Sequence, residues 1–152
     1  MGWVAPVAAA TSAVLSVSAA RQASANGQFN KQVAERNAKL KIQEAEAIQA
    51  KKELDLAKFD EKFRQFEGSA VVAISTSGAE LTGSGMRVMR SNAKQAELEK
   101  NVIDYNAEVG KARAFEQANF SKIQGDIAMN NAKQQSIGYY SQAGTSLLKA
   151  FG

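Results

Sequence analysis

The chain contains no cysteine and no histidine. These absences exclude disulfide frameworks, thiolate chemistry, zinc sites of the usual ligand set and histidine-based acid–base catalysis. Proline occurs once, at Pro6, so nothing further along the chain interrupts a helix through a missing amide.

The remaining polar residues suggest no catalytic constellation. Asp and Glu alternate with Lys and Arg along the chain, which is typical of a solvated helix surface carrying ion pairs. Serine and threonine lack a visible general base. We therefore expect a protein that is not an enzyme, with no catalytic, cofactor-binding or metal site.

Nineteen basic and fifteen acidic residues leave a formal net charge of +4. The basic residues are interspersed with acids, whereas a nucleic-acid-binding protein usually clusters them. We therefore expect no sequence-specific nucleic acid partner. Non-specific condensation of a genome is kept as a competing hypothesis.

Alanine, lysine, glutamate, glutamine and leucine dominate, and all are strong helix formers. The predicted fold is all-α: a long helical hairpin of two extended, coiled-coil-like helices joined by a Gly/Ser corner, with apolar helical termini. Composition divides the chain into an apolar, small-residue N-terminal segment (1–27), a first long helix (28–75), the corner (76–85), a second long helix (86–136) and an amphipathic C-terminal tail (137–152).

The N-terminal segment carries no side-chain charge before Arg21. A signal peptide fits poorly, because no basic residue precedes the apolar stretch. A transmembrane helix is a second interpretation, although alanine and serine make it only weakly hydrophobic. A third is close helix packing, because small residues recur every four positions on one face: Ala8, Ser12, Ser16, Ala20 and Ser24. The residues predicted to insert into a membrane or partner are Trp3, Val4, Val7, Val14, Leu15 and Val17.

Apolar residues in both long helices follow heptad-like spacing. Phe29, Val33 and Leu40 share one stripe in the first helix, which is too long to bury that stripe on itself and needs a partner helix. In the second helix, Leu98, Val102, Tyr105, Val109 and Ala112 indicate a rod suited to folding back on the first. The predicted assembly seam consists of Leu56, Phe59, Phe63, Phe66, Leu98, Val102 and Tyr105.

The segment Ala70 to Ile74 is apolar and β-branched, so it fits either a short strand or a continuation of the helix to about Ser75. We prefer the helix, because no second strand is evident. A corner must follow, since glycines at 78, 83 and 85 are strong breakers. A phosphate-binding loop would need a Lys-Ser/Thr pair that is missing here. The predicted corner residues are Gly78, Leu81, Gly83 and Gly85, with Leu81 packing down as a plug.

The C-terminal tail places its large apolar residues on one helical face and Lys149 on the other. No acid follows Asp126. Membrane contact and protein contact both remain open for this face, whose predicted insertion residues are Ile137, Tyr140, Leu147, Leu148 and Phe151.

The order of these parts resembles a known family. A Met1-Gly2-Trp3 start leads into the apolar segment, and a helix rich in Gln, Ala, Glu and Lys follows. The corner from Ser77 to Ser84 has the pattern Ser-Gly-x-x-Leu-x-Gly-Ser, the second helix contains Asp-Tyr-Asn-Ala at 104–107, and the chain ends in a small-residue apolar tail. This arrangement resembles the small internal virion proteins, or ejection proteins, of short-tailed bacteriophages.

The resemblance implies a protein packed inside the capsid near the portal, which leaves the particle with or before the genome and helps build a conduit across the host cell envelope. Its expected partners are further copies of itself, other internal virion, portal or tail proteins, and the host envelope membrane after ejection. The alternative is a purely structural core or adaptor protein of the virion without membrane activity.

Overall fold

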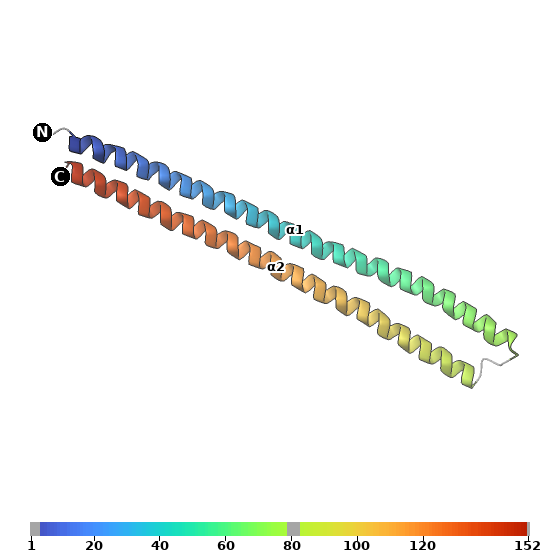
Figure 1. The fold of residues 1–152 in the computed structure, drawn as a ribbon. Coiled ribbons are helices and arrows are strands. Elements are labelled where there is room, and N and C mark those ends of the chain that lie inside the picture. The colour runs from blue at the N-terminus through green and yellow to red at the C-terminus, as the bar shows by residue number, and fades with distance from the viewer. Residues whose placement is uncertain (1–3, 79–82, 152) are drawn as a thin grey trace. The chain divides into compact units, whose positions relative to one another are not determined.

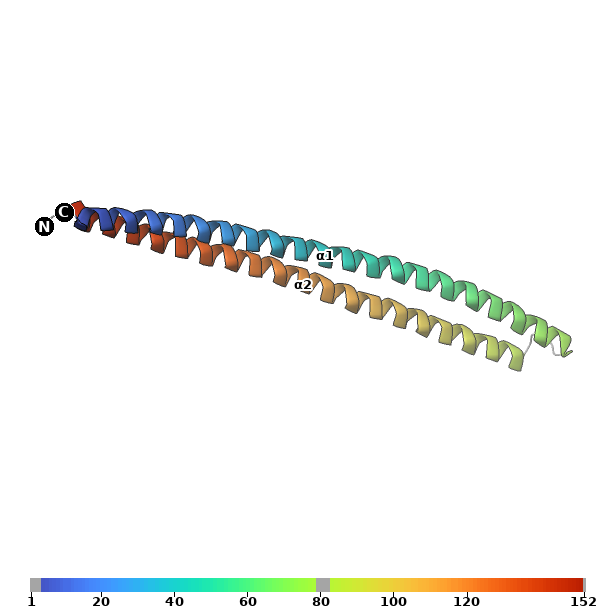
Figure 2. The same cartoon turned by 45° about the horizontal axis from the view of Figure 1, so that its top comes forward.

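The computed structural model describes the backbone over residues 4–78 and 83–151, and the side chains over 11–78 and 83–149. It contains two helices, α1 (Val4–Thr76) and α2 (Ser84–Phe151). They lie side by side and run in opposite directions, as both views show (Figure 1 and Figure 2). The predicted all-α helical hairpin is therefore confirmed, and no strand occurs in the described part of the chain.

Both helices run without a break through the compositional boundaries expected at 27/28 and 136/137. Helix formers fill these stretches, and Pro6 lies in the first turn of α1, where its missing amide disrupts no helical hydrogen bond. The segment 70–74 is also helical, which confirms the preference for helix over strand. Composition therefore changes along each helix while the backbone conformation does not.

The corner uses glycine at two positions that require a left-handed backbone. Gly78 has a φ of 70° and Gly83 a φ of 69°, which only glycine adopts at little cost. The Ser77 amide still donates to the Ala73 carbonyl at 3.1 Å, and the Arg87 amide donates to the Gly83 carbonyl at 3.3 Å. Gly78 thus follows the end of α1 as a C-terminal capping residue.

The predicted corner extends too far at its C-terminal boundary. Gly85, assigned to the corner, lies in the first turn of α2, which begins at Ser84. The hydrogen bond from Arg87 to Gly83 explains the difference, because it closes a helical turn across Gly85. Leu81, the expected plug, lies outside the described residues.

The hairpin divides into two compact units, which we describe separately. The terminal unit comprises Met1–Lys41 and Gln117–Gly152, and the corner unit comprises Ile42–Glu116. In the terminal unit the beginning of α1 lies beside the end of α2 (Figure 1).

The two helices of the terminal unit meet through small residues. Gly27 packs so closely on Ala132 that a Cβ added to this glycine would lie 2.2 Å from the alanine Cβ. A Cβ on Gly125 would lie 2.9 Å from that of Ala34. Small residues allow this close approach of two helix backbones. We call these contacts the small-residue seam; its buried members are Ala13, Ala20, Gly27, Ala38, Ala118, Gly125, Ala132, Ser136 and Ala143.

The corner unit buries alanine as well, at Ala45, Ala96, Ala107 and Ala114. Towards the corner the contact changes character, because Phe59 and Phe63 of α1 lie half-buried between the helices. The core of this unit thus consists of buried alanines, which phenylalanine rings join nearer the corner.

Candidate functional site

The apolar stripe expected on the second helix faces away from the first. Leu98, Val102 and Tyr105 are each more than half exposed, whereas Ala96 and Ala107 are buried. At 3.6 residues per turn these two sets lie on opposite sides of α2. The second helix does fold back on the first, but through alanine rather than through the stripe. We call Leu98, Val102 and Tyr105 the outward stripe; its assignment to assembly stays a prediction.

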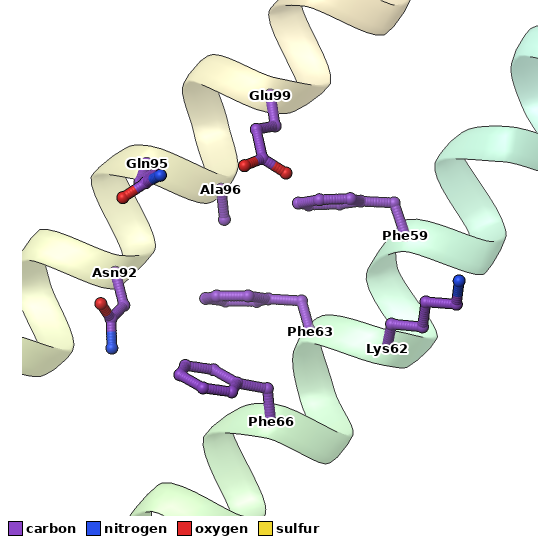
Figure 3. Close-up of a pocket in the computed structure, with 8 residues that line it drawn as sticks. All are labelled: Phe59, Lys62, Phe63, Phe66, Asn92, Gln95, Ala96 and Glu99. Carbon is purple, nitrogen blue, oxygen red and sulfur yellow. The ribbon is translucent and has the colours of Figure 1, made fainter.

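The other part of the predicted assembly seam lies against α2 within the same chain. Phe59 and Phe63 stack with ring centroids 6.3 Å apart, and Phe63 and Phe66 are 6.4 Å apart. Figure 3 shows the three rings extending from α1 towards Ala96 of α2. Leu56 is half-buried on the same side. These four residues therefore contribute to the hairpin itself, and a role between chains would have to use the exposed part of each side chain.

The rings line an open hollow between the helices. Lys62 of α1 and Glu99 of α2 also line it, together with Asn92, Gln95 and Ala96 (Figure 3). The lining of this hollow is therefore partly apolar and partly polar.

Ion pairs connect the two helices of the corner unit. Lys52 Nζ lies 2.6 Å from Asp104 Oδ1 and 3.4 Å from Glu108 Oε1, and Lys100 pairs with Asp60. These pairs match residues of α1 with residues of α2 and so favour one register.

Two pKa values in this network depart from their usual range. The hydrogen bond that Lys52 donates to the Asp104 carboxylate raises the pKa of the half-buried Lys52 ammonium above 10.5, and burial opposes this effect. The hydrogen bond from Lys111 lowers the pKa of the Glu108 carboxyl below 4.5, with Lys52 adding to the effect. Lys111 also donates to Gln49 Oε1 of α1 at 3.0 Å. Both shifts favour the charged forms, so the network persists at neutral pH.

The terminal unit carries a second exposed apolar surface. Val14 and Leu15 of α1 are exposed, and Val17 is half-buried. On α2, the predicted tail residues are exposed as well: Ile137, Tyr140, Leu147 and Leu148. The hairpin brings these two sets, from opposite ends of the sequence, onto neighbouring helices (Figure 1). The side chains of Val4, Val7 and Phe151, and the whole of Trp3, lie outside the described residues.

The hydroxyl of Ser136 joins the two helices in the terminal unit. It is buried, and its oxygen lies 2.9 Å from the carbonyl oxygen of Ala20 on α1 and 2.9 Å from that of Ala132 on α2. One ion pair in the same unit crosses between the helices, from Lys31 Nζ to Asp126 Oδ1 at 3.0 Å. The carboxylate of Asp126 raises the pKa of Lys31.

Sequence reasoning missed the small-residue seam as the contact between the helices. The expected small face stepped by four, from Ala8 to Ser24, and of it Ala20 is buried while Ser12, Ser16 and Ser24 are half-buried. The signal that could have revealed the seam is a step of seven: Ala13, Ala20, Gly27 and Ala34 on α1, and Ala118, Gly125 and Ala132 on α2.

Within the described residues, no helix has a stretch long and apolar enough to span a membrane, and no cluster of acidic side chains could hold a metal ion.

No protein-family model, no curated protein and no solved structure matches this chain.

Proposed function

We propose that this chain is a structural protein of a bacteriophage virion, which oligomerises and takes part in genome ejection by forming part of a conduit across the host cell envelope. In this proposal it has no enzymatic activity. It resides inside the capsid near the portal and reaches the host envelope after ejection. The resemblance of its parts to the internal virion proteins of short-tailed phages suggests the setting.

The observation that carries the assembly half of this proposal is the outward stripe. Three large apolar side chains at coiled-coil spacing lie uncovered on the side of α2 opposite to α1. Such a stripe costs about 25 cal/mol for each Å² of apolar surface left in water. A helix of a second chain, of the same or another virion protein, would bury it. Single exposed leucines are ordinary in proteins, but a regular stripe is typical of an interaction surface.

The membrane half rests on the terminal unit, where exposed apolar side chains from both ends of the chain gather on two neighbouring helices. A ring of several hairpins would present many such ends together, so assembly and membrane contact would reinforce each other. The alternative is a core or adaptor protein of the virion that assembles in the same way and never contacts lipid.

Sedimentation velocity of the full chain, followed by dye release from lipid vesicles, tests the proposal. We expect oligomers that dissociate when Val102→Glu places a charge in the outward stripe. Gln65→Glu is the matched control, because it adds the same charge at an exposed position of α1, away from the stripe on α2. Oligomers without dye release would favour the adaptor. A wild-type chain that is monomeric at all concentrations, with vesicles left intact, would refute the proposal.

A further inference from the structure

All of the formal net charge of the chain comes from its two ends. Residues 1–34 and 127–152 hold four basic residues and no acidic one, whereas residues 35–126 hold fifteen of each. The hairpin brings these ends together, because the beginning of α1 lies beside the end of α2 in the terminal unit (Figure 1). A protein that is electrically balanced over most of its length therefore has one positively charged end.

The four cations of this end are Arg21, Lys31, Lys133 and Lys149. Lys31 is paired with Asp126. Within the described residues, no ion pair involves the other three. Their charge is therefore available to a ligand outside the chain.

Two of these cations lie among the exposed apolar residues. A groove between the helices is lined by Val14, Val17 and Arg21 of α1 and by Leu147 of α2. On α2, the steps of four, three and eight from Lys133 through Ile137 and Tyr140 to Leu148 keep these residues on one side of the helix, next to Leu147. We call the combined surface the terminal face: Val14, Val17, Arg21, Lys133, Ile137, Tyr140, Leu147 and Leu148.

The terminal face combines apolar side chains with cations and contains no acid. An anionic phospholipid surface matches both properties, because apolar side chains enter the boundary between headgroups and acyl chains while Lys and Arg meet the phosphates. The long side chains of Arg21 and Lys133 can reach outwards to headgroups while their stems lie along the apolar surface. Duplex DNA would satisfy the two cations, but its phosphate backbone would leave Ile137, Leu147 and Leu148 without apolar contacts.

We propose that the terminal face is a docking surface for anionic phospholipid headgroups, with Arg21 and Lys133 selecting for charge and the apolar residues entering the membrane interface. This inference deepens the proposed function and rests on its membrane half.

Binding of the full chain to sedimenting vesicles tests the proposal. The probes are vesicles of phosphatidylcholine alone and of phosphatidylcholine mixed with phosphatidylglycerol. The test variant is Arg21→Gln with Lys133→Gln. The matched control is Lys58→Gln with Arg113→Gln, which has the same net charge but changes exposed residues of the corner unit. Circular dichroism of each variant checks that the helices are retained.

The wild type is expected to prefer the mixed vesicles. The test variant should bind them on the order of 30-fold more weakly, at about one kcal/mol for each basic residue near an anionic surface. The control should bind nearly as well as the wild type. Ile137→Gln should also weaken vesicle binding, because it removes an apolar contact while leaving every charge in place.

Equal losses of vesicle binding in the test and control variants would overturn the proposal, because binding would then depend on the net charge of the chain and not on the position of the cations. Equal wild-type binding to neutral and mixed vesicles would overturn it too, as would loss of duplex DNA binding in the test variant with vesicle binding unchanged. Sedimentation velocity on the same variants separates these outcomes from failure of the proposed function, since the outward stripe is intact in all of them.

Discussion

Replacing Gly27 with alanine tests the closest contact between the two helices. The added Cβ would lie 2.2 Å from the Cβ of Ala132, well inside the roughly 3.5–4.0 Å at which carbon atoms rest in contact. Neither methyl group can rotate away, because each is fixed to its helix backbone. The helices must therefore move apart locally, and the small-residue seam must loosen around the new methyl group.

Two opposing contributions set the size of the effect. Overpacking of a tight contact typically costs about 1–3 kcal/mol, while alanine is a better helix former than glycine by about 1 kcal/mol. The same substitution at Gly138 isolates the second contribution, because nothing lies within 4 Å of a Cβ added there. We expect Gly138→Ala to stabilise the hairpin and Gly27→Ala to be less stable than Gly138→Ala by about 1–3 kcal/mol.

Gly125 of the small-residue seam and Gly110 of the corner unit extend this comparison into a series. An added Cβ would lie 2.9 Å from Ala34 at Gly125 and 3.4 Å from the Ile48 side chain at Gly110. The loss in the free energy of unfolding caused by a change to alanine should therefore decrease from Gly27 through Gly125 to Gly110. A second change, Ala132→Gly, should rescue Gly27→Ala, because the nearest atoms to the new methyl group would then be the Ala128 carbonyl oxygen at 3.6 Å and the Cα of residue 132 at 3.7 Å.

Urea unfolding followed by far-ultraviolet circular dichroism measures these free energies. All variants should be compared at one protein concentration, since oligomerisation would add to the apparent stability. Equal stabilisation by Gly27→Ala and Gly138→Ala would refute the reasoning, because it would mean that the helices do not meet at Gly27. Additive effects of Gly27→Ala and Ala132→Gly would refute it in the same way.

Three further predictions concern other contacts. Ser136→Ala should lower the free energy of unfolding by about 0.5–1.5 kcal/mol, as the loss of a buried hydrogen bond to the opposite helix requires, whereas exposed Ser141→Ala should change it little in the same urea assay. Val102→Glu should reduce the oligomer mass in sedimentation while leaving the helix content by circular dichroism unchanged; a collapse of helix content would place Val102 inside the hairpin instead. Because Lys111 lowers the pKa of Glu108 below 4.5, this carboxylate stabilises the fold above that pH, and its contribution disappears as the pH falls through the lowered pKa. Glu108→Gln should therefore make the thermal stability depend less on pH on the acid side. An unchanged pH profile in Glu108→Gln would contradict this prediction.

Much of the fold could be predicted from local patterns. Strong helix formers and the lack of proline after Pro6 indicated two long helices, and the glycines at 78 and 83 marked the corner. These features depend on the intrinsic conformational preferences of a few neighbouring residues, so they can be predicted from the local sequence. The error at Gly85 arose because a glycine after a corner can begin a helix as well as extend the corner, and the choice depends on a hydrogen bond to Gly83.

The surfaces were harder to predict. The heptad stripes showed which residues share a side of each helix, but a stripe does not specify its partner. Leu98, Val102 and Tyr105 had the spacing expected for packing on the first helix, yet they face away from it. The terminal face depends even more on the fold, because Arg21 and Leu147 are far apart in the sequence and line one groove only in the hairpin.

The sequence by itself therefore determined the helices, the corner and the residue content of each helix side. Tertiary structure alone decided which sides meet, because two antiparallel helices approach most closely where both present alanine, glycine or serine, and Gly27 and Gly125 pack almost backbone to backbone on Ala132 and Ala34. Once these small residues are in contact, the large apolar side chains on the opposite sides of the helices stay exposed. The two ends of the chain, which hold basic but no acidic residues, then form one surface.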